Sequence, residues 1–375
     1  IPQLRDFLFN KKSNMKKQIL VFILICTVLY SNAQVIISND TSFCSPQSHD
    51  LHAISSIPSS MSVDDYHGIV IPLGFNFEFY GNTYNKCVLS GNGYITFDTT
   101  VANLTSPWMI NAAIPNPLSG QMPENAIMAP WHDIDLNIGG NLTYGSTGAA
   151  PNRMFIVTWC AIPMYSTSCN SLLHTSQLIL YEGSNKIEMF IQDKPICLTH
   201  NSGYAVQGLV DANSANADIV TDPVSGLPRN WSLIPTPWTA TNEGWEFLPN
   251  TPTSYNINSI TYQPIIAGAA TWYDAAGTVL GTGPNLTVNP TNTTTYYCSV
   301  SGSCIAGTSF DSVIVSIEGC IDFSLTSTPT SCLGTDGTIT VAPNLGTTSP
   351  PWDIKLKDFN GVNLQVANNV ITNTY

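Results

Sequence analysis

The chain has 375 residues, and its 12 basic residues against 25 acidic ones give a net charge of −13. With so few basic side chains the chain cannot form a phosphate-binding surface. We therefore expect neither nucleic acid nor an anionic membrane as a partner. Hydrophobic residues make up 43% of the chain, which is ordinary for folded domains and argues against wholesale disorder. The length predicts two or three domains.

A basic segment followed by an apolar one predicts export. Met15-Lys16-Lys17 precedes an almost entirely apolar run, residues 19–30, and small residues end at Ala33 as a cleavage site requires. The alternative is a membrane anchor, but an apolar run of about 12 residues is too short to span a bilayer. We therefore expect an upstream extension (1–14), a signal peptide (15–33) and a secreted or cell-surface mature chain without a membrane span.

Ten cysteines minus Cys26 of the signal peptide leave nine. In an exported protein these are candidates for disulfides, although sequence does not determine their connectivity. Our pairing hypothesis is Cys44–Cys87, Cys169–Cys197, Cys298–Cys304 and Cys320–Cys332, with Cys160 left over. A Cys-x-x-Cys pair is absent from the sequence, so a zinc site of the usual spacing is not predicted.

The stretch from Ile71 to Phe97 predicts a three-stranded meander. Its first part alternates phenylalanine with polar residues, the pattern of a half-buried strand. Tyr80-Gly81-Asn82-Thr83 and Ser90-Gly91-Asn92-Gly93 supply turn residues. The expected strands are 75–79, 84–89 and 94–98. One meander cannot bury its own apolar face, so the rest of the domain must cover it.

Short alternating or apolar runs continue to about residue 250. They are 155–159, 177–181, 186–191 and 204–210. Turn clusters separate them, and sustained helical periodicity is confined to the signal peptide, so residues 34–250 are predicted to form a β-sandwich. The expected fold class is all-β throughout.

Two further β modules are expected after a linker at residues 251–254. Trp272 on a middle strand and Tyr296 two residues before Cys298 are typical of an immunoglobulin-like sandwich, predicted over 251–318. The earlier partner cysteine of that fold is missing, so Cys298 must pair elsewhere or stay free. Residues 319–375 are short for a complete sandwich and are expected to be a partial third module.

Four motifs together resemble the nidogen-type (NIDO-like) extracellular domain. They are GNGYITF at 91–97, AIMAPWHDID at 126–135, FIVTW at 155–159 and TSQLILYE at 175–182. The chain also resembles exported, multidomain surface proteins of gliding Bacteroidetes-type bacteria. The expected module at 251–318 is similar to the Ig-like or PKD-like modules of such proteins. The expected module at 319–375 is similar to a truncated SprB-type repeat, through residues 332–341 and 351–352. This resemblance implies a cell-surface protein associated with gliding motility and type IX secretion.

Asp133, Asp135 and Asn137 are calcium candidates, because their spacing places three oxygen ligands on one face of an expected strand. Ile138 and Tyr144 stand where an EF-hand needs Gly and Glu. The alternative is a solvated polar strand face, since Ca²⁺ takes about 6–8 oxygens. No other cofactor is expected.

Trp108, Trp231 and Trp238 lie beside Pro, Ser and Thr in expected loops and are candidate aromatic anchors. The alternative is core packing, since tryptophan is highly buried on average. The connections at 99–124 and 211–241 are long for a compact domain unless they are functional. These loops carry little basic charge, since 99–124 has no Lys or Arg and 211–241 has Arg229 alone, so they favour an extracellular glycan or protein surface as the partner.

Catalytic motifs are missing from the sequence: there is no G-x-S-x-G elbow, HExxH or P-loop. Asp133 and Asp135, two apart on a strand, cannot straddle a sugar as a glycosidase pair would. The six histidines lack clear metal-ligand spacing and are expected at the surface. We therefore expect an adhesin or structural surface protein and no enzyme. The alternative is a set of non-catalytic N-terminal modules of a larger secreted polysaccharide or protein hydrolase.

Overall fold

The computed structural model describes residues 37–54, 57–117, 121–148, 150–233, 236–266, 268–302, 304 and 307–317. Beyond these it describes the backbone of four strands: β21 (Phe323–Thr328), β22 (Thr338–Pro343), β23 (Trp352–Lys357) and β24 (Asn363–Val370). The predicted signal peptide, the upstream extension and the Cys320–Cys332 pair lie outside the described residues.

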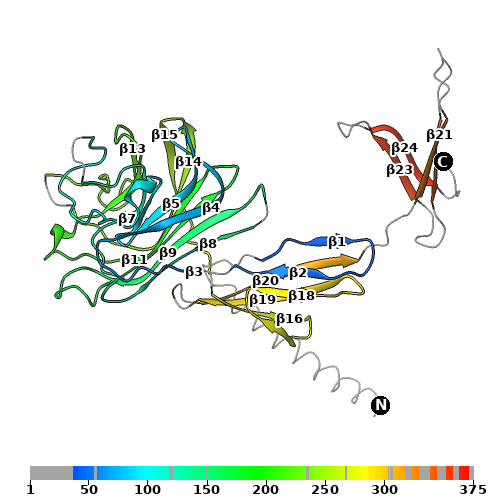
Figure 1. Cartoon of the computed structure of the whole chain (residues 1–375), viewed down its shortest axis with the longest axis horizontal. Coiled ribbons are helices and arrows are strands. Elements are labelled where there is room, and N and C mark those ends of the chain that lie inside the picture. Colours follow the sequence, from blue (N-terminus) through cyan, green and yellow to red (C-terminus); the bar gives the residue numbers. More distant parts are fainter. Residues whose placement is uncertain are drawn as a thin grey trace, which may run out of the picture. The chain divides into compact units, whose positions relative to one another are not determined.

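The chain is all-β, as predicted (Figure 1). Across the described ranges its helical segments are two short 3-10 turns, η1 (Thr99–Val101) and η2 (Asn201–Gly203). Two compact units are present. The first contains residues 37–38, His52–Leu286 and Tyr297–Asp311, and the second contains Asn39–Leu51, Thr287–Tyr296 and Ser312–Tyr375. Within the described part of the chain, no helix is long and apolar enough to cross a membrane.

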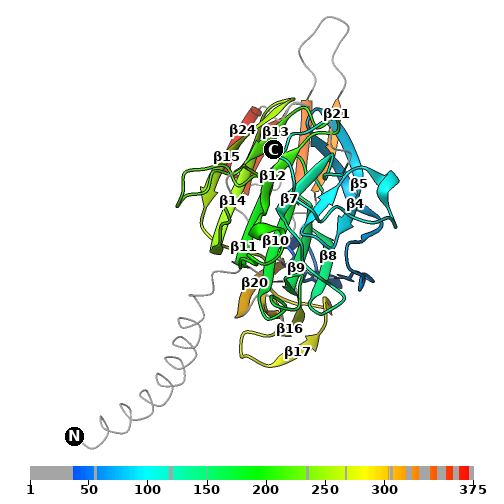
Figure 2. The same ribbon diagram turned by 90° about the vertical axis from the view of Figure 1, so that its left-hand side faces the viewer.

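The first unit contains a seven-stranded antiparallel sheet, whose central strands run side by side in Figure 2. In spatial order its strands are β15 (Ser254–Ile260), β14 (Ala240–Thr251), β11 (Ile187–Lys194), β10 (Leu173–Tyr181), β9 (Met154–Pro163), β8 (Asn141–Thr147) and β3 (Ile57–Pro58). The four runs predicted between residues 155 and 210 supply β9, β10 and β11 of this sheet and one strand of its partner.

The partner is a six-stranded sheet. Its order is β13 (Ala217–Ile219), β12 (Val206–Val210), β7 (Ala126–Trp131), β6 (Tyr94–Thr96), β5 (Asn82–Ser90) and β4 (His67–Phe79). The predicted meander is confirmed as the antiparallel pairs of β4 with β5 and β5 with β6. Along β4, buried and exposed residues alternate from Ile71 to Phe79, which matches the period of a half-buried strand.

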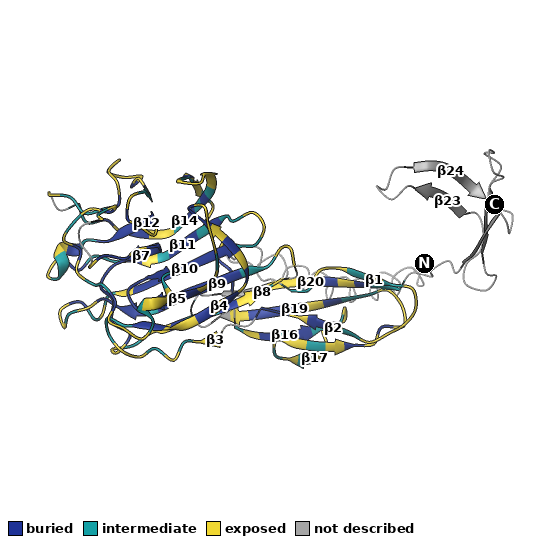
Figure 3. Ribbon diagram, turned by 45° about the horizontal axis from the view of Figure 1, so that its top comes forward, coloured by how far each residue is buried: buried dark blue, intermediate teal, exposed yellow. Residues whose placement is uncertain are grey.

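The two sheets bury one shared hydrophobic core. Phe77 and Phe79 of β4 lie in it with Phe155 and Trp159 of β9 and Phe247 of β14. Figure 3 shows these strands carrying runs of buried positions. Each fully buried side chain of this kind contributes roughly 1.5–3 kcal/mol, so the meander is stable only with the second sheet against it.

Gly93 is required by the close approach of the turn before β6 to the chain of β7. Its φ is +81°, and a Cβ there would lie 2.1 Å from the carbonyl oxygen of Pro130. The amide of Ala129 donates to the Gly93 carbonyl at 2.9 Å. A larger residue would therefore force these two segments apart.

The remaining strands include β16 (Ala269–Tyr273), which pairs antiparallel with β17 (Val279–Thr282) and with β19 (Thr294–Gly302). Trp272 of β16 is buried and its Nε1 donates to the Gly283 carbonyl at 3.1 Å. In the second unit, β1 (Thr41–Phe43) pairs in parallel with β20 (Gly307–Ile317). The strands β2 (His49–His52) and β18 (Asn285–Val288) form a separate pair. The antiparallel pairs β21–β22 and β23–β24 follow.

The sandwich differs from the expected residues 34–250 at both ends. Residues 251–254, expected to be a linker, form the turn between β14 and β15, so the sheet continues to Ile260. Residues Asn39–Leu51 belong to the second unit. The C-terminal difference is a local hairpin between β14 and β15, whereas at the N-terminal end β1 pairs with the distant residues 315–317.

The disulfide hypothesis is partly right. Cys169–Cys197 is confirmed, but Cys160, expected to be left over, pairs with Cys304 across 144 residues. The pairs Cys44–Cys87 and Cys298–Cys304 are therefore wrong. Cys87 and Cys298 are free and buried, and Cys44 is bonded to a cysteine other than Cys87. Pairing by sequence proximity failed because Cys87 faces the core between the sheets.

Candidate functional site

The segment between β6 and β7 covers the outer face of the six-stranded sheet. This sheet is apolar on both faces, because residues that alternate with the inter-sheet core form a second cluster on its other side. Ile110, Ile114 and Met122 of the connecting segment are buried in that cluster against Tyr94 and Trp131. The long loop predicted at 99–124 is therefore anchored to the sheet by its own apolar side chains.

Polar contacts fix the course of this loop. Asp98 caps η1 by accepting from the amide of Thr100 at 2.9 Å. Asn230 holds Ile114 at both backbone groups: its Oδ1 accepts from the amide at 3.0 Å and its Nδ2 donates to the carbonyl at 2.6 Å. Trp131 Nε1 donates to the Pro107 carbonyl at 2.9 Å.

The loop and the sheet line a half-open pocket of about 640 Å³. We call this the loop pocket; its lining includes Tyr94, Trp108, Met109, Met122, Asp98 and Glu124. None of its described lining residues is Lys or Arg. His67, also in the lining, is buried with its Nε2 2.7 Å from the hydroxyl of Tyr94, and burial lowers its pKa to about 4. Its imidazole is therefore neutral at neutral pH.

The three tryptophans predicted as binding anchors have different environments. Trp108 lines the loop pocket, is partly exposed, and stacks on His200 with ring centroids 5.8 Å apart. Trp231 is partly buried and packs against the cluster beneath the loop. Trp238 is 6% exposed and donates from Nε1 to the Ala205 carbonyl at 3.0 Å. The prediction of an anchor at Trp238 is therefore wrong, because this side chain is part of a buried layer.

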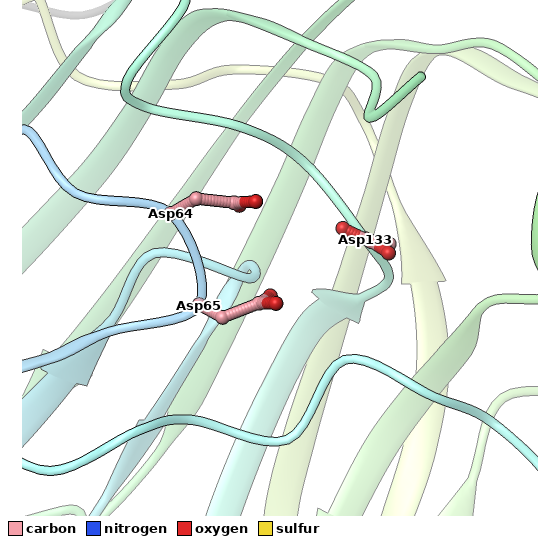
Figure 4. Close-up of side chains that lie close together, drawn as sticks. All are labelled: Asp64, Asp65 and Asp133. Atoms are coloured by element: carbon pink, nitrogen blue, oxygen red, sulfur yellow. The ribbon is translucent and has the colours of Figure 1, made fainter.

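A second feature lies beside the base of this loop. Asp64 and Asp65 precede β4, and Asp133 follows β7; Figure 4 shows the carboxyl groups of the first two directed toward the third. One oxygen from each lies within 4.8 Å of the others. Asp65 Oδ1 accepts from Asn92 Nδ2 at 2.9 Å, and Asp133 Oδ2 lies 2.6 Å from His200 Nε2. We call these three residues the acidic cluster.

Burial and mutual repulsion disfavour the charged form of each carboxyl group. Burial, followed by the charges of Asp65 and Asp64, raises the pKa of Asp133 to about 8. Burial and the charge of Asp65 raise the pKa of Asp64 to about 6. The pKa of Asp65 is also raised, again mainly by burial. The protein thus provides little compensation for negative charge on these carboxyl groups.

The NIDO-related family model matches residues 44–249, more than half of the chain. This chain belongs to the NIDO-related family. The matched range contains the loop pocket and the acidic cluster. No curated protein matches the chain.

In this NIDO-related domain the calcium candidates do not gather as the sequence suggested. Asp133 and Asp135 lie in the irregular segment after β7 and are buried, whereas Asn137 is exposed. The backbone amide of Asn137 donates to Asp135 Oδ1 at 2.8 Å, which is a turn contact. A calcium site formed by Asp133, Asp135 and Asn137 stays a prediction, and the carboxylates found close to Asp133 are those of Asp64 and Asp65. Sequence reasoning missed Asp64 and Asp65, whose only signal was two adjacent aspartates.

Three histidines of the NIDO-related domain are buried, contrary to the expectation of surface positions: His67, His132 and His174. The rings of His132 and His174 lie 4.4 Å apart. Burial lowers the pKa of both, for His174 to about 3. They are neutral core residues at neutral pH.

Proposed function

We propose that this NIDO-related chain is a secreted or cell-surface adhesin that binds an extracellular glycan or protein through the loop pocket. The observation that supports this most is the pocket itself. It is about 640 Å³ in volume, within the usual range of ligand sites, and it has a partly exposed tryptophan in its lining.

The chemistry of the lining favours an uncharged, hydroxyl-rich ligand. The indole of Trp108 offers a flat apolar face, as aromatic anchors do at binding surfaces. Asp98 and Glu124 can accept hydrogen bonds from hydroxyl groups and repel anions. A neutral sugar satisfies both conditions, so a glycan is preferred to an acidic polymer.

The compartment supports the same proposal. Disulfides such as Cys169–Cys197 persist in oxidising, extracellular environments. The NIDO-related domain is itself of an extracellular type. We infer that residues 261–318 and 319–375 are Ig-like and SprB-type modules of one exported adhesin of the gliding-motility, type IX secretion kind. We also propose that the chain has no enzymatic activity.

Binding of the full chain to an array of neutral glycans tests this function. Trp108→Ala should weaken the best signal at least tenfold, because a lost aromatic anchor costs about 1–2 kcal/mol or more. The melting temperature should change little, since Trp108 is partly exposed. Phe310→Ala is the control, because it also removes an aromatic ring, and Phe310 is exposed and lies outside the pocket lining. Equal binding by the wild type and Trp108→Ala would reject the proposal.

A further inference from the structure

Three carboxylates from two separate segments converge beside the loop base, and we propose that Asp64, Asp65 and Asp133 bind one Ca²⁺ ion (Figure 4). This inference does not depend on the proposed adhesive function. It concerns a different set of residues from the pocket lining and is tested without any glycan.

The distances between the oxygens suit a single calcium ion. Two oxygens that bind the same Ca²⁺ at about 2.3–2.6 Å can be at most about 5 Å apart. One oxygen from each of the three residues lies within 4.8 Å of the others. The three oxygens are therefore close enough for one ion to contact all three carboxylates after small adjustments of their side chains.

Unpaired buried oxygens give an independent reason for a ligand here. Asp133 is 5% exposed; its Oδ2 contacts His200 and Asn201, but its Oδ1 has no hydrogen-bond partner in the described structure. Asp64 Oδ1 is likewise buried without a partner. Buried carboxylate oxygens are costly unless a donor or a cation satisfies them.

A cation would stabilise the charged form of the site. Among the described ion pairs, neither Lys nor Arg contacts Asp64, Asp65 or Asp133. Asp135 adds a fourth nearby carboxylate, since its charge acts on Asp64. A divalent ion would compensate most of this charge and would leave His200 Nε2–H free to donate to Asp133.

Calcium fits better than magnesium. The ligands come from two adjacent residues of one turn and a single residue of the irregular segment after β7, an arrangement that Ca²⁺ accepts with water completing its shell. Mg²⁺ requires near-ideal octahedral ligands at about 2.0–2.1 Å. With three carboxylates and water, the expected dissociation constant is about 10⁻⁴–10⁻³ M, the range of extracellular calcium modules.

Hydrogen bonds connect the acidic cluster to the loop at 99–124, which forms the loop pocket. The amide of Ser106 donates to the Asp65 carbonyl at 2.7 Å. Asn92 Nδ2 contacts both Asp65 and the Pro107 carbonyl, and Asn201 Nδ2 contacts both Asp133 and the Trp108 carbonyl. Calcium should therefore slow hydrogen exchange at the amide of Ser106.

Calorimetric titration of the metal-free full chain with CaCl₂ tests the assignment directly. We expect one Ca²⁺ per chain and a rise in melting temperature at about 10 mM Ca²⁺, because an ion bound only to the folded state stabilises it. Asp64→Asn and Asp133→Asn should each weaken Ca²⁺ binding at least tenfold. Glu246→Gln on β14, which also removes one carboxylate, is the matched control and should bind as the wild type does.

The wild type alone can overturn the proposal, even if a variant does not fold. Absence of both a heat signal and a melting shift up to 10 mM Ca²⁺ would show that the acidic cluster is not a calcium site. Equal affinity for Mg²⁺ would reject the assignment to calcium. Unchanged affinity in a folded Asp64→Asn variant would place the bound ion elsewhere.

Discussion

Two cationic side chains, Lys194 and Arg229, are each 1% exposed. Both contact Trp238 in its buried position. Lys194 Nζ donates to the Trp238 carbonyl at 2.7 Å, and the guanidinium carbon of Arg229 lies 4.0 Å from the centre of its ring. Arg229 is compensated by Asp222 at 3.0 Å and by Glu243. Lys194 has no carboxylate partner among the described ion pairs, so its charge is the costly one.

The stability of the fold should therefore depend on pH through Lys194. Burial, followed by the charge of Arg229, lowers its pKa from 10.5 to about 7. Between these two values the unfolded chain binds more protons than the folded one, so the free energy of unfolding rises with pH. Urea titrations between pH 7 and 9 should show a steeper rise for the wild type than for Lys194→Met.

Lys186→Met is the control for this comparison. Lys186 pairs with Glu188 at 2.6 Å and is partly exposed, so its removal should leave the pH slope as it is in the wild type. If the wild type and Lys194→Met have the same slope, Lys194 is charged inside the fold and the argument is wrong.

At the scale of elements, the local pattern of apolar and polar residues predicted the strands well, but it did not predict which distant residues contact one another. The alternation of phenylalanines at 75, 77 and 79 defined β4, because a period of two is a local property. The same reasoning could not place Asp64 beside Asp133, since that contact depends on how β4 and β7 are arranged in one sheet. The length of the loop at 99–124 was evident from the sequence. That this loop covers an apolar face of the sheet was not predicted.

The loop at 99–124 should become more mobile when the side chain of Asn230 is removed. Asn230 satisfies both backbone groups of Ile114, and Asn230→Ala leaves them unpaired at a cost of about 1–3 kcal/mol. Hydrogen exchange at the Ile114 amide should become faster while β9 and β10 stay protected. Asn292→Ala, an exposed site, is the control. Unchanged exchange at Ile114 in Asn230→Ala would show that the apolar contacts alone hold the loop.

At the scale of the whole molecule, the fold class and the sandwich were predictable and the covalent connections were not. Composition and turn spacing sufficed for an all-β chain. The bond between Cys160 and Cys304 joins residues 144 positions apart, and no pattern near either cysteine indicates the other. Burial of Trp238 was unpredictable for a similar reason, because Lys194, which donates to its carbonyl, is 44 positions away in the sequence.

Peptide mapping without reduction should recover the Cys169–Cys197 and Cys160–Cys304 links. Cys87 and Cys298 should resist alkylation in the native protein and react after denaturation, because both are buried and burial raises their pKa, for Cys298 to about 12. A Cys298–Cys304 link, or rapid labelling of Cys87 in the native state, would contradict this assignment.

Hydroxyl-radical footprinting of the full chain, with and without the best-bound neutral glycan of the array, tests the loop pocket as the binding site most directly. We predict protection of Trp108 and Met109, which line the pocket, and unchanged oxidation of Leu233, which is 88% exposed outside it. Protection at Leu233 with none at Trp108 would place binding on another surface and contradict the account.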